Sequence, residues 1–126
     1  MTVGKEIGEF DMKTTSITFE PGKGDYLTAH INFDGDATGE IECRALATMT
    51  VESRNGKDGD YKICARCFLA DGEILDAAGE GKTLLDGKHN WQVAGIAEVA
   101  GQRTWAVQGT IDLEKGAFVG KMFERT

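Results

Sequence analysis

The chain has 126 residues, and its 14 Lys and Arg against 21 Asp and Glu give a formal charge of −7 at pH 7. This length predicts a single domain spanning residues 1–126, and the acidic balance argues against nucleic acid and anionic membranes as partners. The longest apolar runs, such as residues 67–70, are too short for a membrane span or a secretory signal.

The numbers of glycines and cysteines give further indications of the type of protein. Seventeen glycines against one proline are typical of a chain with many tight turns and bent strands. Three cysteines leave an odd one if two of them pair, and no leader sequence points to export. We therefore expect a cytoplasmic protein in which all three cysteines are thiols.

Turn-forming sequences recur along the whole chain and divide it into about eight segments. Several contain Asn-Gly or Asp-Gly, which supply the positive φ angles that hairpin turns require. The pattern predicts a meander of antiparallel strands. The predicted turns are residues 21–25, 34–36, 55–60, 71–72, 86–88, 100–101 and 114–116.

The first two segments alternate apolar and polar residues, as a strand with one buried face does. In the first segment the apolar face changes phase, because Phe10 and Met12 occupy even positions whereas Ile17 and Phe19 occupy odd ones. A β-bulge near residues 14–16 would restore a common face. The second segment, 27–33, keeps one phase throughout, with Leu27, Ala29, Ile31 and Phe33 on its apolar face.

The middle segments differ in how clearly they alternate. Residues 41–51 carry an apolar side chain at every odd position. Residues 61–70 are apolar on both faces, which suggests that part of the outer surface is covered by another subunit. Residues 74–85 give the weakest strand pattern, since Ala77 and Ala78 also suit a short helical turn.

The last segments alternate again, over residues 89–99 and 103–113. Trp91 and Val93 share the apolar face of the first of these, and Trp105 and Val107 share that of the second. A long helix is not expected anywhere, because no window keeps a 3.6-residue period free of glycine.

So short an all-β chain has little helix to cover the second face of a sheet. Closing the sheet on itself removes the exposed edges and buries the apolar face inside. The sequence therefore predicts a single eight-stranded antiparallel up-and-down β-barrel, with a two-sheet β-sandwich as the alternative.

The expected interior of this barrel contains many small residues, which leaves room for a cavity. The competing interpretation is a filled core, in which small residues sit where strands coil closely. Five large residues, Phe10, Phe33, Met49, Trp91 and Trp105, are expected to close one end and leave the other hollow. The predicted ligand-binding residues are Phe33, Cys43, Ala45, Met49, Trp91 and Trp105.

A few polar residues are candidates for proton-transfer chemistry. In the expected register Glu42 and Arg66 are solvated surface charges, but a one-residue slip would turn them into the cavity with Tyr26 and His30. There Arg66 would stabilise developing negative charge, Tyr26 or His30 would move a proton, and Glu42 would be a reserve carboxylate.

Metal and cofactor sites are not expected. Cys64 and Cys67 have the CxxC spacing, but residues three apart on a strand point to opposite faces, which favours structural thiols. His30 and His89 form no pair at metal-ligand spacing, and no phosphate loop or dinucleotide motif occurs.

Two stretches of the chain are similar to a family of small uncharacterised bacterial domains. They are Gly8-Glu9-Phe10-Asp11-Met12 and the turn sequence Phe33-Asp34-Gly35-Asp36-Ala37-Thr38-Gly39-Glu40. The family has an allene-oxide-cyclase-like barrel, related in shape to the lipocalins. The resemblance implies an eight-stranded barrel with a hydrophobic pocket, a shape that also serves cyclases and isomerases without a cofactor. It carries over no catalytic residue, because the matching positions are turn glycines and structural aromatics.

Three functions are compatible with these features. The first is binding of a small apolar molecule inside the barrel, as a carrier or as an accessory protein in a pathway. The second is a cofactor-independent isomerase or cyclase that acts on a hydrophobic small molecule in the same pocket. The third is a non-catalytic module of a homo-oligomer, with Phe68, Val119 and Phe123 at the subunit interface.

Overall fold

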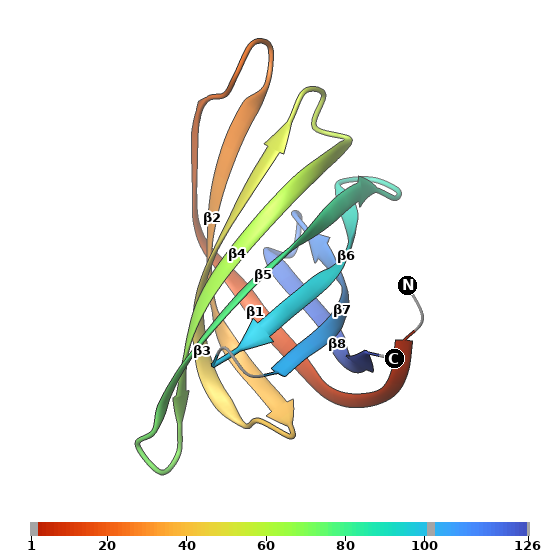
Figure 1. Ribbon diagram of the computed structural model, residues 1–126. Coiled ribbons are helices and arrows are strands. Elements are labelled where there is room, and N and C mark those ends of the chain that lie inside the picture. The colour runs from red at the N-terminus through yellow and green to blue at the C-terminus, as the bar shows by residue number, and fades with distance from the viewer. Residues whose placement is uncertain (1–2, 101–102, 126) are drawn as a thin grey trace.

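The protein is a closed antiparallel β-barrel of eight strands in which each strand pairs with the next and the last pairs with the first (Figure 1). This is a computed structural model, and it describes residues 3–100 and 103–125. The predicted up-and-down barrel is confirmed, and the sandwich alternative is not. The strands are β1 (Val3–Pro21), β2 (Leu27–Gly39), β3 (Cys43–Ser53), β4 (Asp58–Leu69), β5 (Ile74–Leu85), β6 (Asn90–Val99), β7 (Arg103–Asp112) and β8 (Ala117–Arg125).

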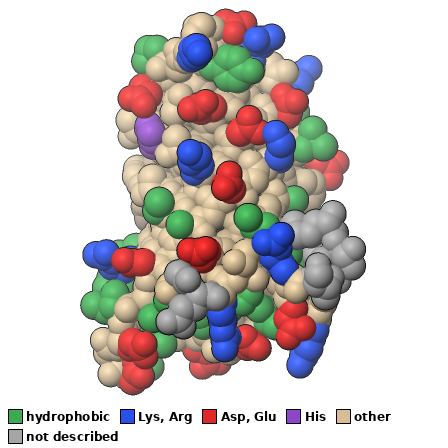
Figure 2. Space-filling model, in the orientation of Figure 1, with side chains coloured by type: hydrophobic (Ala, Val, Ile, Leu, Met, Phe, Trp, Pro, Cys, Tyr) green, Lys and Arg blue, Asp and Glu red, His purple; other side chains and the backbone are tan. Residues whose placement is uncertain are grey.

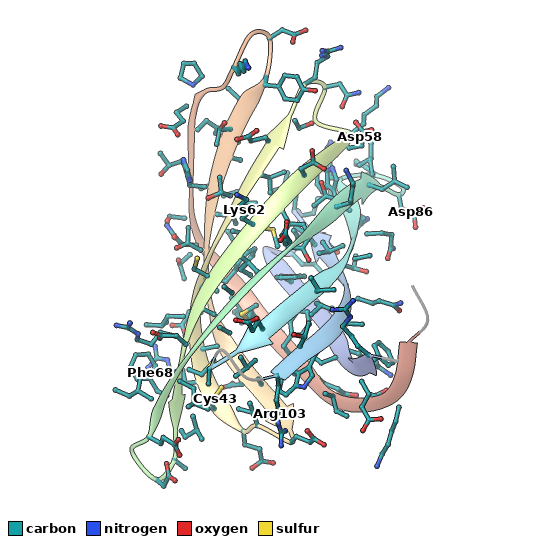
Figure 3. The ribbon with its side chains drawn as sticks, viewed as in Figure 1. Cys43, Asp58, Lys62, Phe68, Asp86 and Arg103 are labelled. Carbon is teal, nitrogen blue, oxygen red and sulfur yellow. The ribbon has the colours of Figure 1, made fainter. Side chains whose placement is uncertain are left out.

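The barrel has two ends that differ in their connections. At the upper end of Figure 1 lie the turns that join β1 to β2, β3 to β4, β5 to β6 and β7 to β8. At the lower end lie the β2–β3 and β4–β5 turns, together with the start of β1 and the end of β8, which pair through Val3 and Arg125. Figure 3 labels Asp58 and Asp86 near the upper end and Cys43 near the lower end.

The first strand contains the bulge that its change of phase predicts. Its pairing with β2 shifts between Thr14 and Ser16. Below the shift Met12 is buried in the core, and above it Ile17 and Phe19 face the interior of the upper end. The bulge lets one long strand keep its apolar side chains inside the barrel over its whole curved length.

The middle of the barrel is closed by large side chains from several strands. They form one cluster in which the Phe33 and Phe118 rings lie 5.2 Å apart and the Phe10 and Phe118 rings 4.8 Å apart. We call this cluster the central plug; its members are Met12, Phe33, Met49, Tyr61, Val93 and Phe118, each no more than 6% exposed. This close packing makes the central plug the hydrophobic core of the barrel.

Glycines facing the plug make room for it. A Cβ atom built on Gly95 would lie 2.5 Å from the Tyr61 hydroxyl oxygen, and one on Gly81 would lie 2.8 Å from the Tyr61 ring. The Tyr61 side chain therefore lies over Gly81 of the neighbouring strand β5 and reaches Gly95 of β6. At mid-height, the small inward-facing residues therefore accommodate large side chains, as the filled-core interpretation predicts.

The five large residues do not gather at one end of the barrel, as the sequence suggested. Phe33 and Met49 lie in the central plug at mid-height, and Phe10 packs against it. Trp91 lies toward the upper end and Trp105 toward the lower end, on opposite sides of the central plug. Space remains on both sides of the plug, and the two spaces differ in size. Within the described part of the chain, no helix has the length and apolarity that crossing a membrane requires.

Candidate functional site

The upper end of the barrel is hollowed into an open cup of about 410 Å³. Inward-facing residues of β1, β2, β3, β5, β6 and β7 form its wall, and the central plug forms its floor. The apolar part of the wall includes Ile17, Leu27, Ile31, Val51, Trp91 and Ile111. We call this space the upper cup.

The rim of the upper cup exposes large apolar side chains to solvent. Phe19 is 60% exposed, Leu27 49% and Leu113 46%, although all three stand on the inner side of the barrel. Figure 2 shows hydrophobic side chains at the upper end among acidic and basic ones. An apolar concave surface with an apolar rim is typical of a site that takes an apolar ligand.

The turn between β3 and β4 is held over one side of the cup. The indole nitrogen of Trp91 donates a 2.8 Å hydrogen bond to the Gly56 carbonyl oxygen, which ties the wall to the turn. Within the turn, Ser53 Oγ accepts from the Gly56 amide at 2.8 Å and donates to the Asp58 carbonyl at 2.6 Å. Gly56 has a φ of 76°, which an L side chain rarely adopts. These contacts order the mouth without a ligand.

Charge is sparse at the upper cup. Arg54 lines it, next to the polar side chains of Ser53, Asn55 and Thr83. The Arg54 Nε atom lies 3.2 Å from Asp25 Oδ1, and its guanidinium carbon lies 5.2 Å from the centre of the Tyr26 ring. The cup therefore offers a mainly apolar wall with one cationic group at its mouth.

A second, smaller space lies below the central plug. This lower cavity has a volume of about 120 Å³ and an almost wholly apolar wall, to which Cys43, Ala45, Cys67 and Trp105 contribute. Burial raises the pKa of the Cys67 thiol to about 12, and burial also raises that of Cys43. Both thiols therefore stay protonated near neutral pH and are poor nucleophiles and metal ligands. Cys64 is exposed on the outer face, so the two CxxC cysteines do point to opposite faces.

The six predicted ligand-binding residues all face the interior, but they divide among three places. Trp91 lines the upper cup. Phe33 belongs to the plug, as does Met49, which also lines the lower cavity. Cys43, Ala45 and Trp105 line the lower cavity. The sequence analysis did not predict most of the residues that line the upper cup. Phe19 and Leu27 could have indicated it, because each continues a row of inward-facing apolar residues up to a turn.

The four predicted catalytic residues are not brought together. Tyr26 lies in the β1–β2 turn against Arg54, and Glu42 is exposed between β2 and β3 at the other end. His30 lies on the outer face, where Nε2 is 2.9 Å from Glu20 Oε1 and Nδ1 is 3.1 Å from Thr50 Oγ1. Arg66 also lies outside the barrel. The isomerase hypothesis therefore gains no support from their positions.

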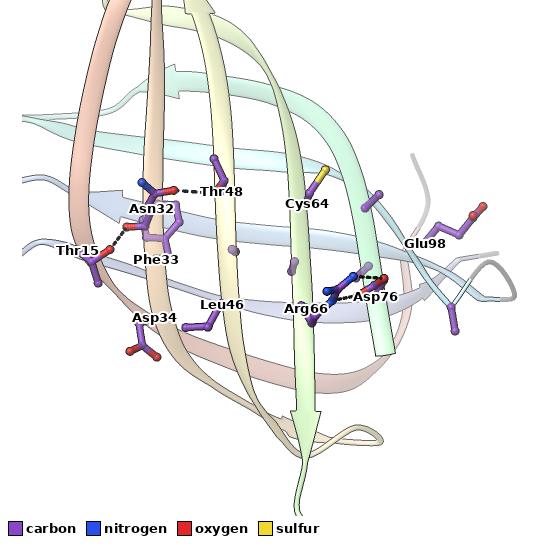
Figure 4. A pocket seen from close by; sticks show the side chains of 15 residues that line it. Thr15, Asn32, Phe33, Asp34, Leu46, Thr48, Cys64, Arg66, Asp76 and Glu98 are labelled. Carbon is purple, nitrogen blue, oxygen red and sulfur yellow. Dashed lines mark hydrogen bonds and ion pairs between the residues drawn. The ribbon is translucent and has the colours of Figure 1, made fainter. Parts of the chain in front are cut away.

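A broad groove crosses the outer face of β2 to β5 (Figure 4). Several of its polar groups are paired with one another: Arg66 donates to both carboxylate oxygens of Asp76 at 2.7 and 3.0 Å, and Thr48 Oγ1 donates to Asn32 Oδ1 at 2.6 Å. The Arg66 guanidinium holds the pKa of Asp76 below its ordinary value. A groove in which several polar groups are already paired with one another is a weaker candidate than the upper cup.

Comparisons with protein-family models, with curated proteins and with solved structures found no match to this chain. Among the residues that the structure describes, no group of three or more His, Cys, Asp or Glu side chains is placed to hold a metal ion. The resemblance to the allene-oxide-cyclase-like family stays a prediction.

Proposed function

We propose that this protein binds one small apolar molecule in the upper cup, as a carrier or as an accessory protein in a pathway. The observation that carries the proposal is a preformed cup of about 410 Å³ with an apolar wall and an exposed apolar rim. This volume lies within the range of about 300–1,000 Å³ that small-molecule sites in proteins occupy.

The driving force would be removal of apolar surface from water. A ligand in the cup covers its own surface and that of Phe19, Leu27 and Leu113, each about half exposed in the free protein. Because the strands and the Trp91 hydrogen bond to Gly56 already order the wall, little conformational entropy is lost on binding.

The lower cavity is less suited to this role. Its volume of about 120 Å³ is close to the size that holds a molecule like benzene, whereas the upper cup has room for a longer chain. The homo-oligomer prediction concerns the outer surface, where Phe68 is 38% and Val119 43% exposed, and it is compatible with ligand binding.

Filling the cup tests the proposal directly. Ala29 faces the cup between β1 and β3, so Ala29→Phe should occupy ligand space and weaken binding of decanol by at least about tenfold. Ala94→Phe is the matched control, because Ala94 is exposed on the outer face of β6. Isothermal titration calorimetry measures both. Equal affinities of the two variants and the unmodified protein would contradict the proposal.

A further inference from the structure

Arg54 stands apart from the other residues of the upper cup. Among the described residues that line the cup it is the one charged side chain, and it lies at the mouth, directly after the last residue of β3. An arginine at the edge of an apolar site is suited to bind the polar end of an amphipathic molecule.

The contacts of Arg54 differ from those of two other arginines in this protein. Arg44 donates to both oxygens of Asp34 at 3.0 and 2.7 Å, and Arg66 holds Asp76 in the same two-point way. The shortest ion-pair distance of Arg54 is 3.2 Å, from Nε to Asp25 Oδ1. Its two terminal nitrogens make no hydrogen bond to any side chain or backbone group in the described part of the chain. The Arg44 and Arg66 pairs each use Nε and one terminal nitrogen, whereas in Arg54 it is Nε that faces Asp25. The terminal nitrogens of Arg54 can therefore bind a carboxylate.

The surroundings of Arg54 hold the guanidinium without enclosing it. The Tyr26 ring stacks beneath it at 5.2 Å, and both Arg54 and Asp25 are about two-thirds exposed. An exposed ion pair contributes little to stability, so a ligand carboxylate can replace or join Asp25 at low cost. A guanidinium prefers two parallel hydrogen bonds to a carboxylate.

We infer that the ligand of the upper cup is an amphipathic carboxylate, with its apolar chain in the cup and its carboxylate on the terminal nitrogens of Arg54. This inference rests on the proposed function, and it names the chemical class of the ligand. Asp25 is a competitor for the same guanidinium, so it weakens the binding of the carboxylate.

The test compares decanoate with decanol, which share a chain length and differ in the head group. Arg54→Gln should weaken decanoate binding by about tenfold and change decanol binding by less than about twofold. Asp25→Asn should strengthen decanoate binding, because the competing charge is gone. Arg44→Gln is the matched control, since the Arg44 side chain has the same 64% exposure but lies on the outer face with Asp34.

The outcomes separate this inference from the proposed function. If decanoate and decanol bind the unmodified protein but Arg54→Gln affects both equally or neither, the carboxylate inference is overturned and the apolar site stands. If neither molecule binds, both the inference and the proposed function are wrong. If Arg44→Gln weakens decanoate binding as much as Arg54→Gln does, the effect is one of net charge, and the inference is also overturned.

Discussion

Trp91 and Trp105 both face the interior of the barrel from neighbouring strands, yet they lie on opposite sides of the central plug. Trp91 pairs with Ile111 near the upper end of β6 and lines the upper cup. Trp105 pairs with Ala97 lower on the same ladder and lines the lower cavity. The plug between them separates an open cup from a small apolar cavity, and the two tryptophans report on one space each.

The central plug should carry much of the stability of the fold. Met49 is fully buried within it, so Met49→Ala removes packed atoms, enlarges the lower cavity and should cost about 3 kcal/mol of unfolding free energy. Leu46→Ala on the same strand is the control, because Leu46 is 44% exposed and should cost less than about 1 kcal/mol. Urea denaturation measures both, and similar costs would mean that the plug is not a packed core.

The stability should also fall at alkaline pH. Burial raises the pKa of Cys67 from 9.0 to about 12, so the unfolded chain loses this thiol proton at a lower pH than the folded protein does. The contribution is fully present below the ordinary thiol pKa and is lost as the pH rises toward about 12. Tyr61 acts in the same direction, since burial raises its pKa from 10.0 to about 12.

Urea midpoints at about pH 8 and about pH 10.5 measure this effect. Cys67→Ala should show a smaller loss of stability between the two values than the unmodified protein. Cys64→Ala should behave as the unmodified protein does, because Cys64 is exposed. If Cys67→Ala loses as much stability between the two pH values as Cys64→Ala does, burial of Cys67 does not contribute to the pH dependence of stability.

The architecture could be predicted because it depends on local patterns. Alternation of apolar and polar residues with a period of two predicted the strands. The change of phase after Met12 predicted the bulge that the strand pairing shows between Thr14 and Ser16. The same rule placed Cys64 and Cys67 on opposite faces. Even the ambiguous residues 74–85 form a strand, since pairing with β4 and β6 outweighs the weak local pattern at Ala77 and Ala78.

The position of the hollow could not be predicted, because it depends on contacts between distant strands. Alternation shows that Tyr61 and Gly95 both face inward, but not that the Tyr61 hydroxyl fills the space beside Gly95. Arg66 drew attention as a charge in an apolar strand, and its neutralising partner Asp76 is set by the register of β4 and β5. The sequence did not single out Arg54, because its position at the mouth of the cup depends on closure of the barrel.

Tryptophan fluorescence of two single-tryptophan variants tests the central claim most directly. Trp105→Phe leaves Trp91 in the upper cup, and Trp91→Phe leaves Trp105 in the lower cavity. Titration with decanoate should give a saturable change in the emission of the variant that keeps Trp91, and none in the variant that keeps Trp105. A saturable change at Trp105 alone would contradict the account, because the ligand would then occupy the space below the plug.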